Sequence, residues 1–175
     1  IPRFLTIGKT MTLIVQKYGG TSVGTTERIQ AVAEKVIETK KDGNQVVVVV
    51  SAMSGETNRL LSLAEGVVKT PNPRELDVLL STGEQVTIAL LSMALEEKGC
   101  DAVSFTGGQV CIQTDNAYNK ARIINIEVER IQEELQQEKV VVIAGFQGID
   151  ESGNITTLGR GGSDTTAVAI ATALD

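Results

Sequence analysis

Val46-Val47-Val48-Val49-Val50 is the stretch that decides the fold of this 175-residue chain. A strand with one face in water alternates apolar and polar residues, whereas a strand buried on both faces reads as an unbroken, β-branched apolar run. A second run of this kind, Val140-Val141-Val142-Ile143, lies much further along the chain. The two runs predict a central, mainly parallel sheet with helices on both of its faces.

Apolar residues recur at helical spacing in the segments between the predicted strands. A first helix is expected between 27 and 43, and a second is expected to end before Pro71. A third is expected over 74–98, where Gly83 should break or kink it and place Glu84 at a bend. The apolar positions of the first two are Ile29, Val32, Ala33, Val36, Ile37, Leu60, Leu63, Ala64 and Val67.

The rest of the chain continues the alternation of strands and helices. We expect strands at 101–105 and 109–114, a helix at 128–135, and a turn at 151–154 that leads into a strand at 155–157. Such alternation indicates an α/β class. The expected architecture is therefore a three-layer αβα sandwich around a central, mainly parallel sheet.

Two glycine-containing loops each join a strand to a helix and are suited to anions. The first, Lys17-Tyr18-Gly19-Gly20-Thr21-Ser22, follows the strand-like run 13–16. Glycines let the main chain approach a ligand closely, and Lys17 would supply positive charge there. The spacing is not that of the P-loop motif. By itself this loop is weak evidence of a phosphate site, because a lysine at a strand end is usually only solvated.

The second loop is Gly159-Arg160-Gly161-Gly162-Ser163-Asp164-Thr165-Thr166. Ser163 or Asp164 is expected to cap the helix that follows, and a helix N-terminus attracts anions. Arg160 adds a planar fork that matches a carboxylate or a phosphate. Because parallel strands present their carboxyl ends at one edge of a sheet, the two loops should meet there.

Composition excludes several classes of function. The net charge of -6 argues against a nucleic-acid-binding protein, which needs a basic surface. No stretch is expected to approach a membrane span of about 20 apolar residues, and no secretory signal is visible. Cys100 and Cys111 lack metal-ligand spacing, and the chain has no histidine. A cytoplasmic protein with reduced cysteines is therefore expected.

Motifs in one fixed order carry a resemblance to a known family. They are Lys17-Tyr18-Gly19-Gly20-Thr21-Ser22-Val23, 47–53 (VVVVSAM), 81–84 (STGE), 144–148 (AGFQG) and 157–166 (TLGRGGSDTT). Together they closely resemble the aspartate kinases, a group within the amino-acid kinase superfamily, from about Met11 to Asp175. The resemblance implies the same αβα fold.

The resemblance also implies ligands and site residues. The implied ligands are ATP with Mg²⁺ and L-aspartate, and the implied assembly is a homo-oligomer. Lys17 and Asp164 are the implied catalytic residues, with Lys17 on the ATP phosphates. Arg160 is expected at the α-carboxylate of aspartate and Glu84 at its α-amino group. The implied nucleotide-binding residues are Lys17, Tyr18, Gly19, Gly20 and Ser51, and the implied substrate-binding residues are Thr57, Glu84, Phe146, Arg160, Gly161, Gly162 and Ser163.

The absence of histidine fits phosphorylation of a carboxylate. A carboxyl group with a pKa of about 4 is already ionised near neutral pH and needs no general base, unlike an alcohol. The activity that the resemblance implies is that of an aspartate 4-kinase, which forms 4-phospho-L-aspartate as the first step toward lysine, threonine and methionine. Another superfamily kinase, acting on glutamate, acetylglutamate, carbamate or uridylate, remains an alternative. So does a non-catalytic fragment that binds substrate or serves in assembly.

The resemblance also bears on the ends of the chain. Residues 1–10 precede the first expected strand and are interpreted as a tag or as upstream sequence. The resembled kinases continue beyond Asp175 with the half that holds the nucleotide base. Residues 11–175 are therefore expected to be the N-terminal portion of an amino-acid kinase domain, with little or no activity on their own.

Overall fold

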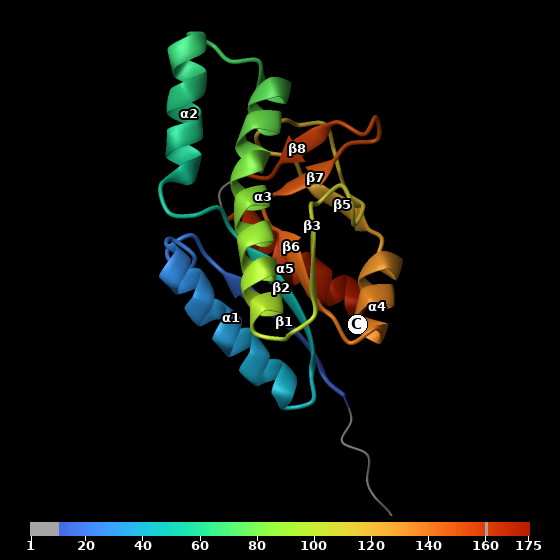
Figure 1. Cartoon of the computed structure of the whole chain (residues 1–175). Coiled ribbons are helices and arrows are strands. Elements are labelled where there is room, and N and C mark those ends of the chain that lie inside the picture. Colours follow the sequence, from blue (N-terminus) through green and yellow to red (C-terminus); the bar gives the residue numbers. More distant parts are fainter. Residues whose placement is uncertain (1–10, 160) are drawn as a thin grey trace, which may run out of the picture.

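A four-stranded parallel sheet, sheet A, forms the centre of the computed structural model, which describes residues 11–159 and 161–175. Its strands are β1 (Leu13–Tyr18), β2 (Gln45–Val50), β6 (Val140–Ala144) and β3 (Ala102–Phe105), in the order β1-β2-β6-β3 (Figure 1). The register pairs Tyr18 with Val50 and Val50 with Ala144. The carboxyl ends of these three strands are therefore level.

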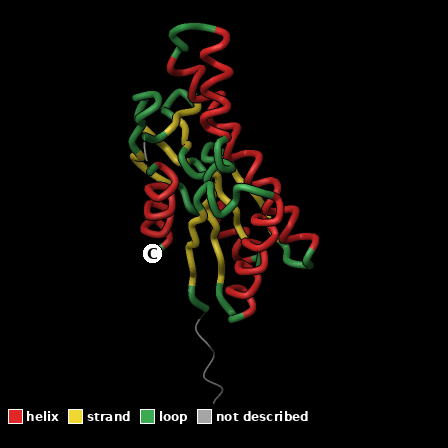
Figure 2. Tube along the Cα trace, turned by 90° about the vertical axis from the view of Figure 1, so that its left-hand side faces the viewer, coloured by secondary structure: helices red, strands yellow, loops and turns green. Residues whose placement is uncertain are grey.

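The two valine runs divide their side chains between the two faces of sheet A. Val46, Val48 and Val50 face α1 (Thr26–Lys41) and the second half of α3 (Pro73–Glu97). Val47 and Val49 face α4 (Glu129–Gln136) and α5 (Gly162–Leu174). Helices accordingly lie on both sides of the strands in Figure 2. This confirms the predicted αβα layers and explains why the strands show no polar alternation.

A second four-stranded sheet, sheet B, lies beyond the carboxyl ends of sheet A. Its order is β5-β4-β7-β8, from β5 (Ile123–Ile126), β4 (Ile112–Thr114), β7 (Gln147–Ile149) and β8 (Ile155–Thr157). The predicted strand 109–114 is too long, because the chain is still turning at Cys111, whose φ is +47°. Strand β5 was not predicted. It is short, and its middle residues are exposed.

α3 continues through Gly83 as one helix, so the predicted break there is wrong. A Cβ atom at position 83 would lie 2.9 Å from the Cβ of Ala52, which is closer than real Cβ contacts. Glycine is needed there because the loop after β2 packs directly on the helix. α2 (Glu56–Val67) precedes α3 and lies beside it (Figure 1).

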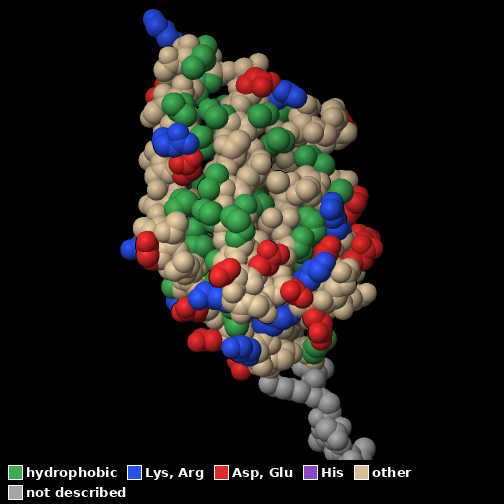
Figure 3. Space-filling model, in the orientation of Figure 1, with side chains coloured by type: hydrophobic (Ala, Val, Ile, Leu, Met, Phe, Trp, Pro, Cys, Tyr) green, Lys and Arg blue, Asp and Glu red, His purple; other side chains and the backbone are tan. Residues whose placement is uncertain are grey.

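By length and composition α3 could cross a membrane, contrary to the expectation that no stretch approaches such a span. In the folded chain it packs against α1, α2 and strands of both sheets. Its buried face carries polar residues such as Asp77 and Glu84, as in a core helix of a globular domain. In Figure 3, charged side chains gather in the lower part of the view, while hydrophobic ones show through higher up, around α2 and α3.

Candidate functional site

A cavity of about 660 Å³ lies at the carboxyl ends of β1, β2 and β6, where sequence analysis expected the two loops to meet. Both loops contribute to its wall, together with the start of α2, the middle of α3 and the end of β8. The lining residues are 17, 20–21, 51–55, 57–58, 61, 80, 84, 119, 146, 157–159 and 161–164.

Lys17 and Asp164 join the two loops across the cavity. Leu13, Val15 and Lys17 of β1 lie on the face of sheet A that α5 covers, because side chains alternate along a strand. Lys17 is the last of the three and lies beside the start of α5. Its Nζ lies 3.1 Å from Oδ1 of Asp164, and the two side chains are 28% and 69% exposed. A pair this exposed adds at most about 1 kcal/mol to stability. Its position at the cavity is therefore better explained by a ligand than by folding.

Two helices present uncapped N-termini to this cavity. α2 begins after Gly55 (φ +81°) and α5 after Gly161 (φ +74°), and no described side chain caps either helix. Unpaired N–H groups and the helix dipole make such ends attractive to anions. The predicted N-cap at Ser163 or Asp164 is therefore wrong. Gly161, in the left-handed conformation, is the N-cap, and both predicted residues lie inside the first turn of α5.

The Gly19-Gly20 turn lets the first loop fold closely against the segment after β2. A Cβ atom at position 20 would lie 2.8 Å from the carbonyl oxygen of Ala52. Tyr18, which alternates with Lys17, points to the opposite face of sheet A, where it packs against the α1–α3 core. The Tyr18 side chain and Gly19 do not line the cavity, whereas Lys17, Gly20 and Ser51 do.

Glu84 brings a buried carboxylate to the cavity and is only 3% exposed. Its Oε1 accepts a hydrogen bond from the backbone N–H of Ala52 at 3.0 Å. Its Oε2 is buried and has no hydrogen-bond partner within the described part of the chain. Burial raises the pKa of Glu84 to about 7, and the Ala52 bond only partly opposes this. A cationic ligand would lower the pKa again and satisfy the free oxygen.

Phe146 holds a left-handed backbone conformation, with φ +70°, which is strained for a bulky residue. Its N–H donates to Oγ1 of Thr166 at 3.1 Å, and its carbonyl accepts from Leu158 N–H at 2.8 Å. These bonds tie the end of β6 to α5 and to β8 at the cavity wall. Phe146 lines the cavity, as do the predicted residues Thr57, Gly161, Gly162 and Ser163.

Arg160 lies outside the described residues, so its predicted contact with a carboxylate remains a prediction. Its neighbours Gly159 and Gly161 both line the cavity.

Sequence analysis missed Asp77, which is fully buried and holds two segments of the cavity wall. Its carboxylate accepts from Asn119 N–H at 3.0 and 3.1 Å and from Thr157 N–H at 2.8 Å. It also accepts from the Thr157 hydroxyl at 2.6 Å. Asn119 and Thr157 line the cavity, and the Oδ1 atom of Asn119 is a second buried acceptor that lacks a partner among the described residues. The available signal was the spacing of Asp77 and Glu84, which lie seven positions apart in the predicted helix and therefore on one side of it.

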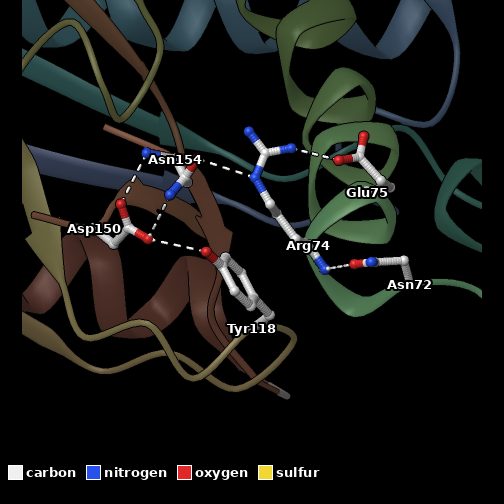
Figure 4. A network of polar contacts seen from close by, with 6 residues as sticks. All are labelled: Asn72, Arg74, Glu75, Tyr118, Asp150 and Asn154. Atoms are coloured by element: carbon white, nitrogen blue, oxygen red, sulfur yellow. Dashed lines mark hydrogen bonds and ion pairs between the residues drawn. The ribbon is translucent and has the colours of Figure 1, made fainter. Parts of the chain in front are cut away.

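A polar network lies next to Asn119 in the chain (Figure 4). The Tyr118 hydroxyl donates to Asp150 Oδ2 at 3.0 Å, and Asn154 Nδ2 donates to the same oxygen at 3.0 Å. Arg74, in the first turn of α3, donates through Nε to Asn154 Oδ1 at 3.0 Å and also pairs with Glu75. The β7–β8 hairpin, the loop that carries Asn119 and the start of α3 are thereby joined.

No group of three or more metal-ligating side chains occurs in residues 11–159 and 161–175. Among the residues that the structure describes, Asp164 supplies the carboxylate beside Lys17, and its side chain is largely exposed. This donor set suits a Mg²⁺ ion that is carried mainly by nucleotide phosphates and water, and does not suit an all-protein cage.

Comparison with known proteins places the chain in a family. The profile of the amino acid kinase family matches residues 12–175. An aspartate kinase of Stutzerimonas stutzeri and an aspartokinase of Pseudomonas aeruginosa are each 66% identical over 164 residues. Aspartokinase 2 of Bacillus subtilis is 58% identical over 164 residues. Each alignment covers 94% of this chain and 40% of the relative, so the chain spans about 40% of the length of these curated relatives.

Solved structures agree with this assignment. The aspartate kinase of Synechocystis is 51% identical with a TM-score of 0.78, and the match covers 93% of this chain and 26% of that one. E. coli aspartokinase III in complex with aspartate and ADP is 26% identical with a TM-score of 0.80, covering 93% of this chain and 47% of that one. The chain belongs to the amino acid kinase family.

Proposed function

We propose that the protein carrying this chain is an aspartate 4-kinase, which transfers the γ-phosphoryl group of ATP to the side-chain carboxylate of L-aspartate. The observation that carries the proposal is the convergence of charge on one cavity. Lys17 and the uncapped starts of α2 and α5 attract anions, while the buried Glu84 attracts a cation. Triphosphate and amino-acid zwitterion together offer matching groups. Aspartate and ADP are bound in the E. coli relative.

The proposed roles follow from where each group lies. Lys17 would bind the phosphates and stabilise negative charge that develops during transfer. The start of α5, with Gly161, Gly162 and Ser163, would bind the amino-acid substrate, as the family resemblance implies. Glu84 would accept from the α-ammonium group of aspartate through its unpartnered Oε2. Arg160 is proposed to bind the α-carboxylate, as the family resemblance implies. The acceptor carboxylate is ionised near neutral pH, so the histidine-free chain needs no base to activate it.

Mg²⁺ is proposed to arrive with ATP and would neutralise part of the charge of the phosphates. Asp164 is the described carboxylate placed to orient Lys17, since the two are in contact. Orientation of this lysine limits the number of geometries in which its charge meets the phosphoryl group.

The wider setting is also part of the proposal. Phosphorylation of aspartate would make this protein the first enzyme toward lysine, threonine and methionine. A cytoplasmic location and a homo-oligomeric assembly are proposed with it, without nucleic-acid or membrane partners. The net charge of -6 supports the absence of a nucleic-acid partner.

The test is L-aspartate-dependent release of ADP by protein expressed from the complete open reading frame. The expected product is an acyl phosphate, which hydroxylamine converts to a hydroxamate, whereas a phosphate ester would not react. L-Glutamate, N-acetylglutamate, carbamate and UMP serve as competing acceptors. Hydroxamate formation with L-aspartate alone supports the proposal. A preference for another acceptor, or no transfer to any, would contradict it.

A further inference from the structure

The buried face of α3 carries a stripe of polar residues along the cavity wall. Asp77, Ser81 and Glu84 are spaced at i, i+4 and i+7, which places them on one side of the helix. They are 0%, 0% and 3% exposed. Buried polar residues on a core helix need partners, and each of the three residues supplies a hydrogen-bond acceptor to a different part of the wall.

The partners lie around the cavity. Glu84 holds Ala52, which follows β2, and the Ser81 carbonyl accepts from Gln147 Nε2 at 2.9 Å. Asp77 holds Asn119 and Thr157 through the four contacts of 2.6–3.1 Å given above. α3 therefore sets the positions of several wall segments that are distant in sequence.

Asp77 differs from Glu84 in that both of its oxygens are occupied. Its partners are backbone N–H groups and a hydroxyl, and no Lys or Arg of the described chain forms an ion pair with it. Burying a carboxylate without a cation is unfavourable, and an apolar residue would fill the helix face at lower cost. A carboxylate here is explained if the positions of the segments that it binds matter.

Those segments lead directly to the part of the cavity wall that carries Phe146 and Gly159. Ala121 N–H donates to the Thr157 carbonyl at 3.0 Å, so the segments that contain Asn119 and Thr157 run side by side. Leu158 N–H then donates to the carbonyl of the strained Phe146 at 2.8 Å. Gly159, next along, lines the cavity. Lys17, the group proposed to bind the ATP phosphates, lies on β1 and not on these segments.

We propose that Asp77 is a positioning residue for the amino-acid-binding part of the cavity, acting through Asn119 and Thr157. This inference rests on the proposed kinase function. Asp77 itself does not line the cavity and touches no reacting group. Its loss should therefore let the wall segment 157–159 shift, and should weaken binding of the amino acid more than binding of ATP.

The test compares Asp77→Asn, Thr157→Val and Thr157→Ser in protein from the complete open reading frame. In Asp77→Asn an NH₂ group replaces one acceptor and faces N–H donors. Thr157→Val removes only the hydroxyl bond, and Thr157→Ser restores it. We expect Asp77→Asn to raise the KM for L-aspartate at least tenfold while the KM for ATP stays within twofold. Thr157→Val should raise the aspartate KM by a smaller factor, and Thr157→Ser should resemble the parent.

Leu95→Ala is the matched control, because Leu95 is fully buried near the other end of the same helix and does not line the cavity. It should lower the melting temperature without changing either KM by more than twofold. If Asp77→Asn changes neither KM, or changes both equally, the inference is overturned. If Asp77→Asn does not fold, an unchanged aspartate KM in Thr157→Val overturns it instead. A parent protein that fails to phosphorylate aspartate contradicts the proposed function itself, and the two failures are thus distinguishable.

Discussion

Four helices of this chain begin in two different ways, while the short α4 begins after Val128, without a described capping side chain and away from the cavity. α1 and α3 are capped by the side chains of Thr25 and Asn72, which accept from Arg28 N–H at 3.3 Å and Arg74 N–H at 2.9 Å. α2 and α5 begin instead after Gly55 and Gly161 in the left-handed conformation, without a described capping side chain. The capped starts lie away from the cavity, and the two glycine starts line it.

The contrast between capped and uncapped helix starts shows that the starts of α1 and α3, away from the cavity, have capping partners within the chain, whereas some polar groups at the cavity have no described partner. Asp77, behind the wall, has both oxygens satisfied, whereas Glu84, on the same helix face, has a free buried oxygen at the cavity. Open donors at helix starts and an open carboxylate at one site favour binding of a ligand of mixed charge.

The largest effect is expected for Lys17→Met in protein from the complete open reading frame. Removal of a charge that acts on the transferring phosphoryl group should lower kcat by about 10²–10³-fold, as for loss of one preorganised electrostatic contact. The aspartate KM should change much less. Because the Lys17–Asp164 pair is partly exposed, stability should fall by no more than about 1 kcal/mol.

Lys98→Met is the control for Lys17→Met. Lys98 forms an ion pair of similar length, 3.0 Å, with Glu34 between α3 and α1, away from the cavity. It should leave kcat unchanged. Near-parental kcat in Lys17→Met would mean that this lysine is only a solvated residue at a strand end.

The fold was predictable because its signals are local. Val46–Val50 reads as a doubly buried strand whatever surrounds it, and the apolar spacing of 29–37 defines α1 without knowledge of its partners. Tyr18 could have been placed on the far face from the two-residue period of a strand. The predicted break at Gly83 failed because helix propensity ignores the tertiary contact with Ala52 that requires a glycine there.

The site was only partly predictable because its decisive contacts are distant in sequence. The bond from Ala52 to Glu84 spans 32 positions, and that from Thr157 to Asp77 spans 80. No local pattern states which backbone N–H a carboxylate will meet. The cap of α5 failed for a related reason. Ser163 has the right chemistry for a cap, but Gly161 adopts the left-handed conformation that starts the helix earlier.

Stability should depend on pH through the buried carboxyl group of Glu84. Its pKa is about 7 in the folded chain against 4.5 for an ordinary glutamate, a difference worth about 3 kcal/mol. The folded state therefore keeps a proton that the unfolded state loses, and this penalty grows as pH rises from 4.5 to 7. Glu84→Gln should thus stabilise the unliganded protein at pH 8 by up to about 3 kcal/mol, and should have little effect at pH 4.5.

Urea denaturation of both proteins at the two pH values measures this difference. The glutamine retains an oxygen for Ala52 N–H, so the packing around the bond is preserved. The variant should also bind L-aspartate more weakly, because the charge opposite the ammonium group is lost. Equal stability gains at both pH values would show that the buried carboxylate is not the titrating group.

Gly83→Ala should have a smaller effect, on stability and site together. The added methyl would meet the Ala52 Cβ at 2.9 Å and displace the loop that carries the Glu84 partner, at a cost of about 1–3 kcal/mol. The matched control is Gly66→Ala in α2, where nothing lies within 4 Å of the new Cβ. It should stabilise by about 0.5–1 kcal/mol through helix propensity. Thermal melts compare the two, and a neutral Gly83→Ala would contradict the close approach.

The smallest effect is expected at the capped helix starts. Thr25→Ala removes the oxygen that accepts from Arg28 N–H, and should lower the free energy of unfolding by about 1 kcal/mol. Because α1 begins away from the cavity, the KM values for ATP and L-aspartate should stay at parental levels.

Gly55→Ala, at the start of α2, keeps an uncapped helix but strains a residue whose φ is +81°, and should raise at least one KM. Urea denaturation and steady-state kinetics on both variants decide the matter. A raised KM in Thr25→Ala would show that a capped helix start also affects ligand binding. Unchanged KM values in Gly55→Ala would show that the uncapped start of α2 does not bind the ligand.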